Sequence, residues 1–430
     1  MTDFLEKTFR LKEHQTDVRT EILAGITTFM TMAYILAVNP GILSAAGMDA
    51  GAVFTATALG ACLGTLLMAL FSNYPFALAP GMGLNAFFAY TVCVAMGYSW
   101  QMALTAVFVE GVIFIALSFI GIREKLVYLL PEALRYAITV GIGLFIAFIG
   151  LKNMGLVVAS PATLVTIGDI TSRETLLGII GLIFTAVILI KNIKGGLLLG
   201  IVVTAIIGIP MGVTHIDGLV SLPPSIEPIF MKLQWGEIFS WDMALIVFTL
   251  LFMDLFDTLG TLVGVSTSAG MIKDGRIPRL NRAFMVDAVS TTLGSMMGSS
   301  TVTSYAESAT GVKSGGRTGI TAAVTAICFI VALFFAPFFL SVPQVAIAPS
   351  LVLVGLMMAS HITSIDFTDF STALPAFVCF MGMPLTYSIS DGLTLGYLSY
   401  VFINMLCGNY KKLSWGMYLL SGFFMCKYLF

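Results

Sequence analysis

The sequence predicts an all-α polytopic membrane protein. Of its 430 residues, 58% are hydrophobic and only 10% are charged, and the mean hydropathy is +0.98. Soluble domains carry about 25% charged residues, so this chain could not cover a globular surface with polar groups. Its apolar residues are also gathered into long runs, and about 20 helical residues cross a hydrocarbon core of roughly 30 Å.

Counting the apolar runs gives fourteen membrane elements. Two of them, 76–97 and 301–316, are apolar but interrupted by special residues. A last stretch, 413–430, carries Lys427 and could span, re-enter or lie at the interface. The twelve regular spans are predicted at 22–44, 52–73, 100–121, 132–154, 174–190, 196–213, 241–266, 280–299, 317–340, 346–361, 373–388 and 390–407.

The basic residues test this count, because cytoplasmic loops collect Lys and Arg. With a cytoplasmic N-terminal segment at 1–21, only Lys152, Arg173 and Lys232 of the 21 basic residues fall in outer loops. Lys427 lies in the last stretch, and all the others fall on the inner side. This asymmetry predicts a multi-pass protein of the cell inner membrane with its N-terminus in the cytoplasm.

The elements also show a weak internal repeat. Leu63-Gly64-Thr65 in the second span matches Leu293-Gly294-Ser295 in the ninth, and an interrupted element follows each of them. Gly196-Leu-Leu-Leu-Gly200 likewise matches Gly392-Leu-Thr-Leu-Gly396. Because seven is odd, a second half of seven elements must be inverted relative to the first. Inverted repeats with interrupted segments in corresponding positions are typical of secondary transporters.

The two interrupted elements are predicted to be half-helices preceded by extended chain. Pro80, Gly81 and Gly83 disfavour a regular helix before Leu84, so the first half-helix is expected from there on. The second is expected to begin near Glu307, after β-branched and hydroxyl residues. Irregular backbone at membrane depth is tolerated only inside protein or beside a cavity. Two helix N-termini meeting there would favour a ligand with acceptor atoms; ordinary kinked helices are the alternative.

Acidic side chains inside the spans are the leading functional candidates, because burying an ionisable group in a membrane is costly. Asp254 and Asp257 are three residues apart, on one helix face with Thr258. Two carboxylates this close repel, which favours a shared proton. Glu307 could stabilise the second half-helix or accept hydrogen bonds from the N–H groups of a planar heterocycle.

Further polar and aromatic residues have weaker claims. Asn85 offers donor and acceptor groups at the tip of the first half-helix, and Phe87 beside it could stack on a ring. Glu110 is alone in its span, which favours a hydrogen-bonded or oligomer-facing carboxylate. Asp287 lies near Arg282, so a structural ion pair is expected there.

With these residues in view, the chain from about Phe9 to Gly408 resembles the AzgA-like purine permeases of the nucleobase:cation symporter-2 (xanthine/uracil permease) superfamily. Four stretches together carry the resemblance: Ala79-Pro-Gly-Met-Gly-Leu-Asn-Ala-Phe-Phe88, Phe252-Met-Asp-Leu-Phe-Asp-Thr-Leu-Gly-Thr261, Thr303-Ser-Tyr-Ala-Glu-Ser-Ala-Thr-Gly311 and Pro384-Leu-Thr-Tyr-Ser-Ile-Ser-Asp-Gly392.

The resemblance implies two inverted repeats of seven elements, with short antiparallel strands in elements 3 and 10. It implies a core domain (22–121 and 241–340) that moves against a gate domain (122–213 and 341–408), with an outer loop at 214–240 and a C-terminal apolar segment at 409–430. It further implies proton-coupled uptake of adenine, guanine or hypoxanthine. Substrate contacts are expected from Asn85, Phe87, Asp257, Thr258, Glu307 and Ser308, and proton coupling from Asp254, Asp257 and Glu307.

The acidic site favours a neutral ligand over an anion, which argues against a sulfate or bicarbonate transporter of the same architecture. A uracil or xanthine permease is the nearer alternative. An intramembrane aspartyl protease would need aspartates on facing helices and a G-x-G-D signature, so no enzyme is expected. No cofactor beyond the coupling ion, no metal and no nucleic-acid partner is expected. Small-residue spacings such as Gly60 to Gly64 allow a homodimer without identifying its face. The preferred purine and the choice of H⁺ or Na⁺ stay open.

Overall fold

The computed structural model describes residues 6, 8–120, 131–215, 218–236, 238–268, 271 and 277–429. Within them, eight helices are long and apolar enough to cross a membrane, and three shorter apolar helices accompany them. The principal helices of the first half are α2 (Val18–Met32), α3 (Ile35–Leu43), α4 (Ala50–Leu67), α5 (Met82–Ala86), α6 (Trp100–Ile120), α8 (Glu132–Asn153), α9 (Arg173–Ile190) and α10 (Gly196–Gly208).

The principal helices of the second half are α11 (Trp241–Ser268), α12 (Leu280–Met296), α13 (Ser308–Lys313), α14 (Gly319–Ala332), α15 (Ala336–Leu340), α16 (Gln344–Ala359), α17 (Phe370–Thr386), α18 (Ile389–Leu406) and α19 (Trp415–Leu429). Each predicted span therefore coincides with helix, apart from differences of a few residues at the ends. The first span departs from the prediction of an unbroken helix, because α2 and α3 are separated at Ala33 and Tyr34.

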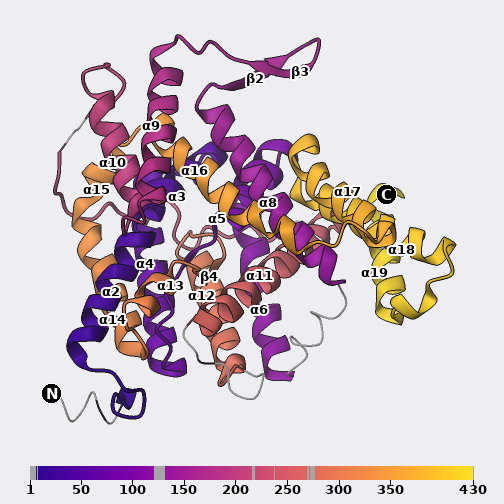
Figure 1. Cartoon of the computed structure of the whole chain (residues 1–430), viewed down its shortest axis with the longest axis horizontal. Coiled ribbons are helices and arrows are strands. Elements are labelled where there is room, and N and C mark those ends of the chain that lie inside the picture. Colours follow the sequence, from indigo (N-terminus) through magenta and orange to yellow (C-terminus); the bar gives the residue numbers. More distant parts are fainter. Residues whose placement is uncertain are drawn as a thin grey trace.

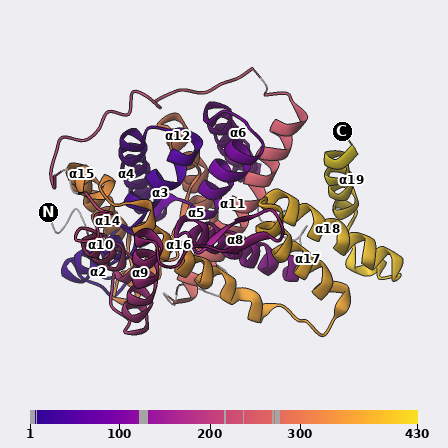
Figure 2. The ribbon, with the colours of Figure 1, turned by 90° about the horizontal axis from the view of Figure 1, so that it is seen from above.

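The helices form two groups (Figures 1 and 2). α8, α9, α10, α16, α17 and α18 pack mainly with one another, and α2, α4, α6, α11, α12 and α14 do the same. Glycines allow the closest approaches: a Cβ on Gly143 of α8 would lie 2.6 Å from the carbonyl oxygen of Gly355 of α16. The repeated glycines act similarly, since a Cβ on Gly200 would lie 2.2 Å from Thr185 and one on Gly392 2.4 Å from Met383.

A carboxylate on the first helix holds the start of a helix far along the chain. Glu21 of α2 is fully buried and accepts hydrogen bonds from the N–H groups of Arg317 (2.8 Å) and Thr321 (3.1 Å). The Thr321 hydroxyl also donates to it at 2.6 Å. These donors belong to the first turn of α14 and the residue before its N-cap, where N–H groups lack the usual acceptors four residues earlier in the helix. Glu21 thus fixes α14 beside α2.

The segments outside the helix groups include a hairpin, a long connection and a C-terminal helix. The hairpin of β2 (Val157–Ser160) and β3 (Leu164–Ile167) projects beyond the helix ends in Figure 1, in a loop that the sequence left without structure. The connection between α10 and α11 runs along one edge of the molecule in Figure 2. α19 packs on α18 and α11, because the Phe424 ring lies 5.4 Å from the rings of both Tyr397 and Phe248.

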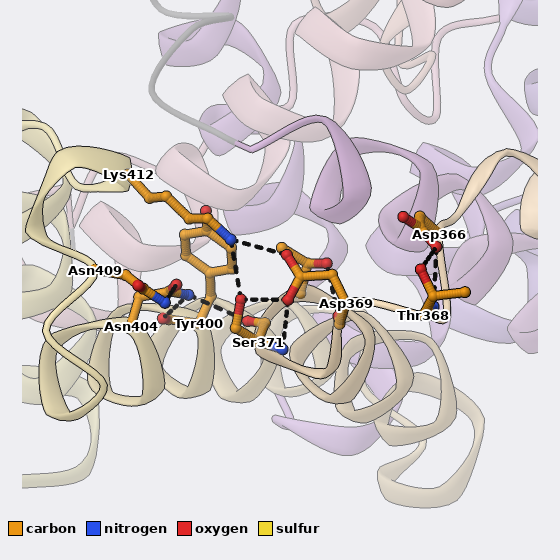
Figure 3. A network of polar contacts seen from close by, with 9 residues as sticks. Asp366, Thr368, Asp369, Ser371, Tyr400, Asn404, Asn409 and Lys412 are labelled. Carbon is orange, nitrogen blue, oxygen red and sulfur yellow. Dashed lines mark hydrogen bonds and ion pairs between the residues drawn. The ribbon is translucent and has the colours of Figure 1, made fainter.

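A polar network joins the start of α17 to the segment before α19 (Figure 3). Asp369 is the N-cap of α17 and accepts the Ser371 N–H at 3.0 Å, while Lys412 donates to its carboxylate at 2.8 Å. Asn404 of α18 donates to the Ser371 carbonyl at 3.1 Å and accepts from Asn409 at 3.2 Å. Hydrogen bonds from Lys412 and Ser371 lower the pKa of Asp369 to about 2.

We predict that Asp369→Ala lowers the melting temperature of the purified protein in detergent more than Asp369→Asn does. The alanine variant loses both the cap, which is typically worth about 1 kcal/mol, and the ion pair with Lys412. The asparagine variant keeps an acceptor for the cap. Because the folded pKa is lowered, the stabilisation by Asp369 is present above its ordinary pKa and is lost as the pH falls from about 4 towards about 2. Between pH 4 and pH 2, roughly, the melting temperature of the wild type should fall more than that of Asp369→Asn. Equal falls would contradict a stabilising role of the ionised Asp369.

Candidate functional site at the strand crossing

Two short strands pair side by side near the middle of the molecule, where Figure 1 labels β4. This place is called the strand crossing below. β1 (Leu78–Pro80) and β4 (Val302–Ser304) pair antiparallel, with Leu78 opposite Ser304 and Pro80 opposite Val302. The N–H of Gly81 donates to Thr301 at 3.0 Å, and the N–H of Tyr305 donates to Ala77 at 2.9 Å. The antiparallel pair expected from the resemblance is confirmed. It satisfies main-chain groups that would otherwise be unpaired at membrane depth.

Each strand is held by a helix of its own half. Thr65 of α4 bonds the main chain of Leu78, and Thr291 of α12 donates to the carbonyl of Val302 at 3.0 Å. The glycines of the predicted repeat let the strands lie close to these helices. A Cβ on Gly64 would lie 3.2 Å from Leu78, and a Cβ on Gly294 would lie 2.8 Å from Val302. In the second half, the hydroxyl that bonds the strand as Thr65 does belongs to Thr291. It lies one turn before Ser295, the residue that the sequence repeat matched with Thr65.

A helical segment follows each strand, as predicted. The first begins at Met82, with Gly81 as N-cap, and α5 continues as π-helix over Phe87–Ala95. It therefore starts two residues earlier than predicted. Gly83 did not delay the helix; its missing side chain leaves room for Ile142 of α8, which a Cβ would approach to 2.6 Å. The second is α13, with Glu307 as N-cap.

Asp257 and Glu307 retain solvent-accessible surface, although both lie deep in the sequence-predicted membrane region. Ala306, directly before Glu307, is exposed, and so is Gly260, one turn after Asp257 on α11. The two carboxylates lie close enough to interact electrostatically, and Asp287 also lies within such range of Asp257. Asp257 also lies near the first half-helix, because a Cβ on Gly81 would be 3.7 Å from its Oδ2.

Glu307 is positioned differently from the capping role that its sequence position suggested. Its side chain makes no cap hydrogen bond to α13. Instead its Oε1 accepts a hydrogen bond of 2.6 Å from the hydroxyl of Tyr34. Tyr34 is fully buried and lies at the break between α2 and α3. Tyr34 was not among the predicted site residues, because nothing in an apolar run marks where a helix will break.

Thr258 joins three elements through its hydroxyl. The Oγ1 atom lies 3.2 Å from Asp254 Oδ1, 3.0 Å from Asp287 Oδ1 and 2.7 Å from Thr303 Oγ1. Asp254, Thr258 and Asp287 are all buried. A hydroxyl carries one proton, so Thr258 can donate to only one of the two carboxylates at a time. Asp287, which was expected to pair with Arg282, thus belongs to the site's immediate surroundings.

Three other predicted site residues are buried in the framework around the crossing. Asn85 donates to Asn39 Oδ1 at 2.6 Å and accepts from the hydroxyl of Ser300. Ser308 accepts the N–H of Ala77 at 2.9 Å. Phe87 is buried in the main hydrophobic core. In this arrangement these side chains brace the crossing, while Asp257 and Glu307 line accessible space.

Glu110 is a third buried carboxylate near the crossing, beside Asp254 and Asp287. It is fully buried on α6, and its Oε2 accepts a hydrogen bond of 2.9 Å from Thr301. Of the two alternatives that the sequence left open, the hydrogen-bonded one fits and the oligomer-facing one is wrong. Among the residues that the structure describes, no group of three or more His, Cys, Asp or Glu could hold a metal ion.

The chain matches the Permease family (Xan_ur_permease) over residues 19–395. It belongs to this family. The permease is therefore a multi-pass membrane transporter and not an enzyme. It is 42% identical to the adenine permease AdeP of Escherichia coli over 427 residues, covering 99% of this chain and 96% of AdeP.

The permease is also 43% identical to the guanine/hypoxanthine permease PbuG of Bacillus subtilis, over 98% of this chain and 99% of PbuG. Its fold is similar to that of the murine anion transporter Slc26a9 in the inward-facing state. That comparison has a TM-score of 0.67 and 12% identity, and it covers 94% of this chain and 72% of Slc26a9.

We predict that Asn85→Ala destabilises the permease, whereas Asp257→Asn does not. The alanine removes the donor to Asn39 Oδ1 and the acceptor of the Ser300 hydroxyl, and a buried unpaired group costs about 1–3 kcal/mol. Asp257 borders accessible space, where an amide is easily solvated. Thermal unfolding in detergent checks this, and equal melting temperatures for wild type and Asn85→Ala would contradict the bracing role.

Proposed function

We propose that this permease imports purine nucleobases, namely adenine, guanine or hypoxanthine, together with protons. Relatives with more than 40% identity over nearly the whole chain are an adenine permease and a guanine/hypoxanthine permease. The observation that carries the proposal is the pair of partly exposed acidic residues, Asp257 and Glu307, beside the strand crossing.

The ligand chemistry follows from these carboxylates. A carboxylate accepts hydrogen bonds and, when ionised, has none to donate. The N–H groups on the edge of a neutral purine supply matching donors. An anion would be repelled by the same oxygens, which disfavours the anion transport named for the structurally similar Slc26a9. A uracil or xanthine permease is the remaining alternative within the family.

Proton coupling is assigned to Asp254, Asp257 and Glu307. Two carboxylates compete for the single proton of the Thr258 hydroxyl, so a proton added to one of them completes the network. Protonation would also relieve the repulsion between Asp257 and its neighbours Asp287 and Glu307. Protonation thus lowers the negative charge of the empty site, which permits the core domain to move against the gate domain during alternating access.

The architecture proposed for this cycle is two inverted repeats of seven elements. The helix group containing α2, α4, α6, α11, α12 and α14 is the core domain that carries the substrate, and the group containing α8, α9, α10, α16, α17 and α18 is the gate domain. The basic residues of the loops support a cytoplasmic N-terminus in the cell inner membrane. A homodimer is compatible with this arrangement.

We predict saturable uptake of radiolabelled hypoxanthine or adenine in cells that lack their own purine permeases, and its collapse with a protonophore. Glu307→Gln should lower kcat/KM at least about 100-fold, because the amide replaces one carboxylate oxygen by an N–H donor that faces the N–H groups of the purine. Asp366→Asn, at an exposed carboxylate, is the matched control and should transport normally.

Competition with unlabelled uracil and xanthine separates the alternatives. If correctly inserted protein takes up uracil or xanthine but neither hypoxanthine nor adenine, the substrate assignment is wrong. Uptake that resists the protonophore but requires Na⁺ would exclude proton coupling.

A separate prediction concerns Tyr34. Removing its hydroxyl in Tyr34→Phe should raise KM about tenfold with kcat little changed, because a hydrogen bond to a charged group is worth about 1.5 kcal/mol and orients Glu307 before the substrate binds. Tyr305→Phe is the control, since its hydroxyl donates to the Pro80 carbonyl and should affect stability instead. Equal KM values for wild type and Tyr34→Phe would exclude the orienting role.

A further inference from the structure

The stretch Pro384–Gly392 contributes no side chain to the proposed site, yet it has an unusual structure. α17 ends at Thr386, and Tyr387 follows in the left-handed conformation with φ of +55°. Helices usually place glycine or asparagine at this position, because a larger side chain is strained there. The contacts of the Tyr387 ring account for a tyrosine at this position.

The Tyr387 ring lies near aromatic side chains of α8 and of the first half-helix. Its centroid is 5.3 Å from Phe145 and 6.2 Å from Phe148, both on α8. Lys152 of α8 lies with its Nζ 5.2 Å from the ring centroid. Tyr90 of the first half-helix meets the ring nearly edge-on, with the two centroids 6.2 Å apart.

The same stretch touches α11 as well. The Ser390 hydroxyl, in the first turn of α18, lies 3.3 Å from the hydroxyl of Thr249, and both residues are buried. The stretch Pro384–Gly392 therefore contacts two elements that form the site, the first half-helix at Tyr90 and α11 at Thr249.

Distances along α11 place this contact on one side of the site. Asp257 is eight residues after Thr249, or about 12 Å along a helix that rises about 1.5 Å per residue. Gly260 lies beyond Asp257 in the same direction; it is exposed, and a Cβ there would meet nothing within 4 Å. The contacts of the stretch Pro384–Gly392 thus lie on the side of Asp257 where α8 leads into the β2–β3 hairpin, and the exposed Gly260 lies on the opposite side.

We propose that Tyr387 is the gate residue that closes this site towards the hairpin end, by packing on Tyr90. The inference rests on the proposed alternating access. Phe145, Phe148 and Lys152 hold Tyr387 to its own helix group, so the contact that opens is the one with Tyr90. A planar base passes between the hairpin end and Asp257 only after these two rings separate.

The first test bridges residue pairs in a chain whose six native cysteines are replaced by alanine. In Tyr90→Cys/Tyr387→Cys, a short bis-methanethiosulfonate cross-linker, which bridges the two thiols through disulfides and releases sulfinate, should lower hypoxanthine uptake at least about tenfold. A reducing agent should restore the uptake by cleaving these disulfides, because the gate must open in every cycle. The control pair, Phe145→Cys/Tyr387→Cys, lies within one helix group and should keep its uptake when bridged. Full uptake by the bridged 90–387 pair would overturn the proposal.

The second test does not need uptake. Gly260→Cys should react with a membrane-impermeant thiol reagent in inside-out vesicles and resist it in intact cells. Adding Tyr387→Gly, which keeps the left-handed backbone without the ring, should raise labelling in intact cells at least about tenfold by shifting the population towards an open outer path. Unchanged labelling overturns the gate. If no variant transports a nucleobase but labelling rises, the proposed substrate fails while the gate stands.

Discussion

Main-chain N–H and C=O groups have no water to bond at membrane depth, and the crossing of β1 and β4 is where the chain meets this constraint without a continuous helix. The strands pair with each other, Thr65 and Thr291 bond them from neighbouring helices, and Tyr305 bonds the Pro80 carbonyl. The strand pairing and the Tyr305 bond join the two halves of the sequence at this point. The two half-helices follow directly after the paired strands, so the strand pairing sets their positions.

The carboxylates around the crossing divide by exposure. Asp254, Asp287 and Glu110 are buried and hydrogen-bonded to threonines, whereas Asp257 and Glu307 reach accessible space. A buried charge needs fixed partners, while an accessible carboxylate can exchange water for a ligand. This division separates groups that brace the crossing from groups that can bind, although all five are acidic residues in apolar runs.

The packing of side chains differs between the two sides of the site. Around Tyr387, packed rings join the two helix groups, and at Gly260 the absence of a side chain leaves space. Packed interfaces have discrete arrangements and do not deform continuously, which is the property that a transporter requires of its moving parts. The strained Tyr387 backbone and the glycine of α11 are thus complementary features of a single pathway.

The sequence by itself determined the helices, the two interrupted elements and the acidic residues, because hydropathy and charge in a bilayer depend on local composition. It also placed Asp257 and Glu307 among the site candidates. Only the tertiary structure decided which candidates reach accessible space: Asn85 is turned into the framework by Asn39 and Ser300, while Asp287 is drawn to Thr258. The break at Tyr34 and its bond to Glu307 likewise join residues 273 positions apart. Such partners are set by how helices pack, and no local pattern encodes a contact between segments so distant in the chain.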